Sequence, residues 1–209
     1  MAGKKLAVAA GAGFESRVWD AVKKLIRESG SLFFAEGAGL TLLKSQAAHS
    51  DSRRGFLYRT GSSEPVGFIC SQWDMYNFMS EKMAGPTSTN TQKRMVKKRL
   101  MSVLSKNLKP DLAFFDFDKE TLFIVEMKTQ SSEGSVDEKL ETVHFKRRQY
   151  KTLALQIGYA NVEFSWALDS KFGEKKYDDV RKYLCEMGSH FEVGAVSLDL
   201  IGFSPAVTK

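Results

Sequence analysis

Apolar residues recur along this chain in two periods, and their alternation predicts a protein of mixed helices and strands. Spacings of three and four residues favour helices, and short runs rich in Val, Ile and Phe favour strands. The predicted helices cover residues 14–28, 73–83, about 136–159 and 177–187. The predicted strands cover residues 31–34, 56–60, 66–72, 111–118, 121–129, 162–168 and 191–200. The strand, helix and strand over 121–168 imply a βαβ crossover, so we expect an α/β fold with a central mixed β-sheet flanked by helices.

The composition is that of one domain with few Cys and His residues. With 209 residues, 43% of them hydrophobic, the chain is long enough for a single domain over 1–209, and neither an internal repeat nor a linker divides the sequence. Two cysteines, Cys70 and Cys185, exclude a disulfide framework, and three histidines are too few for a zinc site built on Cys and His. We therefore expect any metal ion to be held mainly by oxygen atoms.

The sequence contains no run that approaches the roughly 20 apolar residues needed to span a membrane. The short apolar stretch over 6–13 continues directly into Glu15 and a predicted amphipathic helix, without a convincing cleavage site. These features predict a soluble cytoplasmic protein with no membrane partner.

Positive charge is concentrated in one segment of the chain. The formal net charge is +6, and residues 82–110 contain eight Lys or Arg residues and no acidic residue, so subtracting these eight leaves −2 for the rest. Within the segment, apolar residues from Val96 to Leu108 recur at helical spacing, which predicts an amphipathic helix with a basic outer side after a polar loop over 85–92. Such a helix fits a polyanionic partner, although a solvated basic helix face gives the same pattern.

Three charged residues interrupt the two apolar strands predicted over 111–129. If the turn is formed by residues 119–120, Asp111 lies opposite Lys128, and Glu126 shares their face because side chains alternate along a strand. Two carboxylates and an ammonium group then converge, and carboxylates suit a hard cation such as Mg²⁺. Such an ion stabilises charge on a phosphodiester and activates water, which predicts phosphodiester hydrolysis. The alternative is a purely structural ion pair between Asp111 and Lys128.

The same residues form a recognisable sequence pattern. Pro110-Asp111, fourteen intervening residues and Glu126-Met127-Lys128 together resemble the motif of the PD-(D/E)XK nuclease superfamily. The resemblance implies that Asp111 and Glu126 bind Mg²⁺, with Mn²⁺ as a substitute. It also implies that the backbone carbonyl of Met127 adds a metal ligand and that Lys128 is the catalytic lysine.

Within that superfamily the chain is most similar to small type II restriction endonucleases, in its size and in Gln130 followed by residues 134–140. The resemblance implies a restriction-endonuclease-like core over about 110–168 and a sequence-specific double-stranded DNA endonuclease. A palindromic target would favour a homodimer with one active site in each chain. The functional partner implied for such an enzyme is a cognate DNA methyltransferase.

Three further residues lie near the motif or in helices associated with it. Glu15 is expected to add a carboxylate, because it lies on the apolar side of its helix; the alternative is a first-turn carboxylate favoured by the helix dipole. Gln130 has the strand parity of the predicted site, and we expect it either to contact water or the DNA backbone or to be a strand-end surface residue. Tyr150 is interpreted as a core residue. Residues 135–138 are interpreted as a capping box that begins the long helix.

The polar loop and basic helix over 85–109 form the predicted DNA-contacting segment. The predicted DNA-binding residues are Asn90, Gln92, Lys93, Arg94, Lys97, Lys98 and Arg99. Lysines on the helix surface are expected to contact phosphates, whereas the Arg, Asn and Gln side chains are expected to read base edges. Two alternatives stay open at this point: a structure-selective nuclease of DNA repair or recombination, and a noncatalytic DNA-binding module with the same fold.

Overall fold

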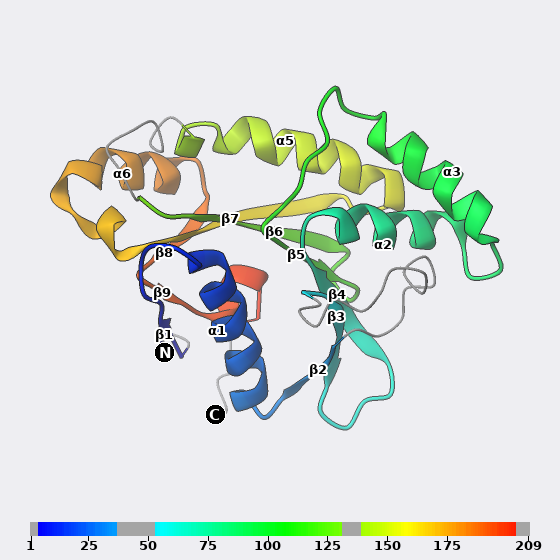
Figure 1. Ribbon diagram of the computed structural model, residues 1–209, viewed down its shortest axis with the longest axis horizontal. Helices are drawn as coiled ribbons and strands as arrows, with labels where there is room; N and C mark the ends of the chain where they lie inside the picture. The colour runs from blue at the N-terminus through cyan, green and yellow to red at the C-terminus, as the bar shows by residue number, and fades with distance from the viewer. Residues whose placement is uncertain (1–3, 37–52, 131–138, 204–209) are drawn as a thin grey trace.

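A seven-stranded mixed sheet forms the centre of the protein in the computed structural model, which describes residues 4–36, 53–130 and 139–203 (Figure 1). The strands, in their order across the sheet, are β2 (Leu32–Glu36), β3 (Gly55–Arg59), β4 (Pro65–Cys70), β5 (Leu112–Asp116), β6 (Thr121–Lys128), β7 (Asn161–Leu168) and β8 (His190–Val193). Neighbouring strands from β2 to β6 are antiparallel, whereas β6, β7 and β8 are parallel. The predicted α/β architecture with a central mixed sheet is confirmed.

Helices cover both faces of this sheet. Figure 1 shows α1 (Phe14–Glu28) below it and both α2 (Trp73–Ala84) and α5 (Val143–Ala154) above it. The described residues also form α3 (Asn90–Met101), which packs against α2, and α6 (Asp178–Glu186), which contacts β8. A second, two-stranded sheet joins β1 (Leu6–Ala7) to β9 (Ala195–Val196). Within the described ranges, none of the helices has the length and apolarity required to cross a bilayer.

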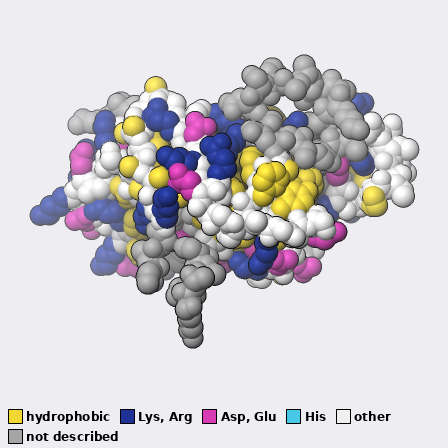
Figure 2. Space-filling view, turned by 90° about the horizontal axis from the view of Figure 1, so that it is seen from below, with side chains coloured by type: hydrophobic (Ala, Val, Ile, Leu, Met, Phe, Trp, Pro, Cys, Tyr) yellow, Lys and Arg dark blue, Asp and Glu magenta, His cyan; other side chains and the backbone are white. Residues whose placement is uncertain are grey.

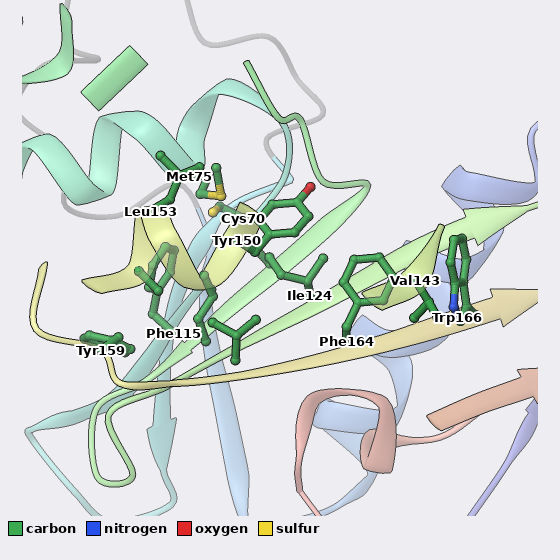
Figure 3. Packing of buried hydrophobic residues seen from close by; sticks show 14 of the residues in the cluster. Cys70, Met75, Phe115, Ile124, Val143, Tyr150, Leu153, Tyr159, Phe164 and Trp166 are labelled. Atoms are coloured by element: carbon green, nitrogen blue, oxygen red, sulfur yellow. The ribbon is translucent and has the colours of Figure 1, made fainter. Parts of the chain in front are cut away.

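Alternation along the central strands fills two hydrophobic cores, one on each face. Phe114 of β5 packs with α1 residues such as Trp19, whereas the next residue, Phe115, packs with α2 and α5. Figure 3 shows the second core, in which Tyr150 of α5 lies among side chains from the strands beneath it. The face seen from below carries a hydrophobic patch at the β2–β4 end of the sheet (Figure 2), and Phe33 of edge strand β2 is 62% exposed.

The βαβ crossover is confirmed, but the boundaries of its helix are not. Strands β6 and β7 are parallel neighbours with α5 between them in sequence, as expected. However, α5 begins at Val143 and is followed by a 3₁₀ turn over Leu155–Ile157, so it is shorter than the predicted helix over 136–159. The predicted capping box at 135–138 lies outside the described residues. The strand predicted over 191–200 is divided at Gly194, whose φ of 65° breaks the extended conformation between β8 and β9.

The register of the β5–β6 hairpin differs from the prediction by two residues. Asp116, not Asp118, pairs with Thr121, so the loop contains four residues. Its conformation depends on the Asp116 carboxylate, which accepts a hydrogen bond from the Lys119 backbone N–H at 2.9 Å, and on Glu120, which has a φ of 46°. Because a shift of two preserves the side-chain parity, the predicted site residues still share a face. Continuing the register by one residue places Asp111 opposite Glu126, instead of opposite Lys128.

Candidate active site

Asp111 immediately precedes β5, where two neighbouring elements hold its backbone. The indole Nε1 of Trp19 in α1 donates a hydrogen bond to the carbonyl oxygen of Asp111 at 3.0 Å. The backbone N–H of Gln72, just before α2, donates to the carbonyl oxygen of Pro110 at 2.8 Å. These contacts fix the point at which the Asp111 side chain leaves the edge of the strand.

The structure brings together all three residues of the sequence motif. The Lys128 ammonium nitrogen lies 3.4 Å from Asp111 Oδ2 and 3.2 Å from Glu126 Oε2. It also donates to the Met127 carbonyl oxygen at 2.9 Å, while the Met127 backbone N–H donates to Asp111 Oδ2 at 2.7 Å. One ammonium group therefore contacts both carboxylates and the carbonyl that were predicted to bind a metal ion.

Helix α5 adds two residues to this site that were not assigned to it from the sequence. Lys146 Nζ lies 3.0 Å from Glu126 Oε2, and the Tyr150 hydroxyl donates to Glu126 Oε1 at 3.3 Å. The two residues are one helical turn apart, so both reach the same carboxylate. Tyr150 is buried, as its interpretation as a core residue requires, but it also has this polar contact. Lys146 and Lys128 both lie near the Trp166 ring, at 5.4 and 5.9 Å from its centroid.

Burial and charge act in opposite directions on the acid–base properties of the site. Burial raises the pKa of Asp111 to about 6; the Lys128 ammonium opposes this change, and the Glu126 carboxylate adds to it. Burial by itself would lower the pKa of Lys128, but the two carboxylates outweigh that effect and raise it. Burial, reinforced by the charge of Glu126, raises the pKa of the Tyr150 hydroxyl well above its ordinary value. Lys128 is therefore a cation at neutral pH, and Tyr150 is a neutral hydrogen-bond donor.

The chemistry of the donor atoms fits a hard divalent cation. Asp111, just before β5, and Glu126, in the adjacent strand β6, offer carboxylate oxygens, and both lie within reach of one cationic group, the Lys128 ammonium. In the ranges that the structure describes, no cluster of three or more His, Cys, Asp or Glu residues is suited to a metal ion. Two carboxylates and a backbone carbonyl leave several positions for water, which is the kind of coordination that Mg²⁺ favours.

Glu15 lies on the apolar side of α1, as predicted, but its side chain is exposed. Trp19 and Val22 share its helical side and are buried, whereas Glu15 belongs to the first turn of the helix. Its charge nevertheless contributes to raising the pKa of Asp111, so the two carboxylates interact electrostatically.

Gln130 is buried, so its interpretation as a strand-end surface residue is wrong. It follows the end of β6, and its backbone N–H donates to Asp169 Oδ2 at 2.9 Å. The Thr129 hydroxyl donates to the same oxygen at 2.6 Å. Asp169 thus joins the chain beyond β6 to the chain beyond β7.

The basic helix is displaced along the sequence relative to its prediction. Helix α3 begins at Asn90, inside the segment predicted as a loop, and ends at Met101, before Leu108. A capping box sets its start, in which the Thr89 side chain accepts from the Gln92 backbone N–H and the Gln92 side chain accepts from the Thr89 backbone N–H. Asn90 and Gln92 are therefore first-turn helical residues, and the Gln92 side-chain oxygen is engaged by the cap.

Only part of the predicted DNA-contacting set faces solvent. The Lys93 side chain is 6% exposed and lies 3.9 Å from Glu81 of α2, so it is buried against α2 and does not belong to the exposed surface of α3. Lys97 is half-buried and donates to Asn77 Oδ1 at 2.6 Å. The predicted residues that are exposed are Asn90, Gln92, Arg94, Lys98 and Arg99.

The chain was compared with protein-family models, with curated proteins and with solved structures, and none of the three comparisons gave a match.

Proposed function

We propose that this protein is a Mg²⁺-dependent endonuclease that hydrolyses phosphodiester bonds in double-stranded DNA at specific sequences. The observation that carries the proposal is the convergence of Asp111, Glu126 and Lys128, in which one ammonium group lies within 3.4 Å of both carboxylates. The hairpin that bears them is followed by α5 and the parallel strand β7. This order supports a restriction-endonuclease-like core over about 110–168, as the sequence resemblance implies.

In the proposed mechanism, Asp111 and Glu126 hold the divalent cation, either Mg²⁺ or Mn²⁺, with the Met127 carbonyl as a further ligand. When bound, the cation supplies positive charge to a phosphodiester and lowers the pKa of a water molecule. Lys128 orients that water or neutralises charge on the phosphate, since the neighbouring carboxylates keep it protonated. Tyr150 holds Glu126 in place through its hydrogen bond.

The proposed DNA surface includes the exposed basic residues of α3, with Arg94, Lys98 and Arg99 near phosphates or base edges. Figure 1 shows α3 beyond α2, at the opposite end of the molecule from the C-terminal end of β6. A duplex that contacts both α3 and Glu126 would therefore run along the face covered by α2 and α5. A homodimer would give two such sites for the two strands of a palindrome, and a cognate DNA methyltransferase would protect the host sequence.

The direct test is incubation of the protein with plasmid DNAs of varied sequence and Mg²⁺. We expect discrete fragments from the wild-type protein, and the variants Asp111→Asn, Glu126→Gln and Lys128→Met should each cut at least about a hundredfold more slowly. The matched control is Asp118→Asn, in the loop at the opposite end of the same hairpin, which should cut at the wild-type rate.

Three other results would contradict the proposal in different ways. Cleavage that prefers branched or nicked DNA over an intact duplex would indicate a repair or recombination nuclease. DNA binding without metal-dependent turnover would indicate a noncatalytic DNA-binding module. An unchanged rate in one of the three site variants would exclude that residue from the mechanism.

A further inference from the structure

The site contains a balanced set of four charges. We call Asp111, Glu126, Lys128 and Lys146 the charge quartet, because two carboxylates and two ammonium groups are joined by contacts of 3.0 to 3.4 Å. Fully ionised, the quartet has no net charge. Uptake of a divalent cation by the same carboxylates would add two positive charges beside two ammonium groups, and like charges at such short range repel one another.

The two lysines of the quartet are held in different ways. Lys128 extends from β6, between the carboxylates, and contacts Asp111, Glu126 and the Met127 carbonyl. Lys146 comes from a separate element, α5, and reaches Glu126 Oε2 with a side chain that is 26% exposed. Its four-carbon side chain can therefore turn toward solvent without disturbing the β5–β6 hairpin.

Glu126 Oε2 is the oxygen for which a lysine ammonium group and a divalent metal ion would compete. It is in contact with both Lys128 and Lys146, while Oε1 accepts from Tyr150. We propose that Lys146 is an exchangeable counter-ion, which occupies Glu126 Oε2 in the metal-free protein and releases this oxygen when a divalent cation binds. The inference rests on the proposed function, because it assumes that Asp111 and Glu126 are metal ligands.

Competition of this kind has a measurable consequence for metal affinity. The ion pair with Lys146 must be given up on metal binding, so it weakens metal binding to the free protein. Removing the ammonium group should therefore strengthen binding, although the variant loses a group from the active site. A purely structural lysine predicts the reverse, because its loss would leave Glu126 less well positioned and would weaken metal binding.

The experiment is calorimetric titration of the full-length, DNA-free protein with Mn²⁺. We expect Lys146→Met to bind Mn²⁺ about tenfold more tightly than the wild type, from the removal of one positive charge near a divalent ion. Lys146→Arg keeps the charge and should resemble the wild type. The matched control is Lys151→Met, which removes an exposed lysine from the same helix and should also leave the affinity unchanged. Thermal unfolding monitored by circular dichroism checks that each variant is folded, and Lys146→Gln replaces Lys146→Met if the latter is not.

The outcomes separate this inference from the proposed function. If the wild type binds Mn²⁺ and Asp111→Asn abolishes binding, but Lys146→Met binds no more tightly than the wild type, the counter-ion role is overturned and the metal site stands. If neither the wild type nor Lys146→Met binds Mn²⁺, or if Asp111→Asn binds it as well as the wild type, the metal site and this inference both fail.

Discussion

Asp111 is a carboxylate in surroundings that favour its protonated form. Burial raises its pKa to about 6 from an ordinary value of 3.8, despite the opposing effect of Lys128. At neutral pH Asp111 is ionised, and folding moves this charge into surroundings that disfavour it. The ionised carboxylate therefore lowers the free energy of unfolding at neutral pH. Groups that are unfavourable for stability and lie in a cluster of charged side chains are common at functional sites.

Replacing this carboxylate should stabilise the fold at neutral pH. We expect Asp111→Asn to raise the free energy of unfolding by about 1–2 kcal/mol at about pH 8, because the variant removes a buried charge but also loses the ion pair with Lys128. The raised pKa stabilises wild type at low pH, and this contribution is lost as the pH rises from 3.8 through about 6. The difference between variant and wild type should therefore grow over that window. Urea denaturation of both proteins at about pH 4 and about pH 8 measures this difference. A variant that is no more stable than the wild type at about pH 8 would contradict the argument.

The hairpin shows how far side-chain periodicity can predict a site and where it stops. Alternation along β5 and β6 places Asp111, Glu126 and Lys128 on one face, and the structure brings them together. The register itself depends on the loop, and residues 117–120 lack the Gly or Asn that normally marks a tight turn. Loop geometry set by the Asp116 side chain and a positive φ at Glu120 is not visible in the apolar pattern.

Replacing Glu120 by glycine should stabilise the fold, because the Glu120 φ of 46° lies in a region that residues with side chains disfavour. We expect Glu120→Gly to raise the free energy of unfolding by roughly 0.5–1 kcal/mol, the relief of left-handed strain less the greater flexibility of glycine in the unfolded chain. Asp118→Gly, in the same loop, is the control and should lower stability, since Asp118 is not among the residues with positive φ. Thermal unfolding of both variants tests the assignment, and a less stable Glu120→Gly protein would refute it.

The start of α3 illustrates a signal that was present in the sequence but was not used. Thr89 and Gln92 have the spacing of a capping box, yet the polar composition of residues 85–92 favoured a loop. The burial of Lys93 against Glu81 has a different origin, because it depends on how α3 packs on α2. Contacts between elements distant in the sequence, like that of Lys146 with Glu126, follow from tertiary packing and leave no periodic pattern.

At the scale of the whole molecule, one sheet supports two hydrophobic cores. Adjacent residues of β5 enter opposite cores, as Phe114 packs on the α1 side and Phe115 on the side of α2 and α5. The mixed sheet and its helices were predictable because they depend on local periodicity. The division of the last strand at Gly194 was not, because it depends on the positive φ of one residue, which the apolar pattern does not show.

The shared sheet predicts that the two cores unfold together. We expect Phe114→Ala and Phe115→Ala each to lower the free energy of unfolding by about 3–5 kcal/mol, the usual cost of truncating a fully buried Phe. Each variant should lose the tertiary environments of Trp19 and Trp166, which lie in different cores, at the same urea concentration. Fluorescence of single-tryptophan versions measures this, and two separate midpoints would show that the cores are independent.

The dependence of Glu126 on α5 has a consequence for biosynthesis. A growing polypeptide that has just released the β5–β6 hairpin from the ribosome already contains both acids of the charge quartet, but Lys146 and Tyr150 have not yet been positioned. The parallel partner of β6, strand β7, emerges later still. The nascent hairpin therefore exposes its acids without their helical partners, and the finished arrangement of the site becomes possible only when the crossover is complete.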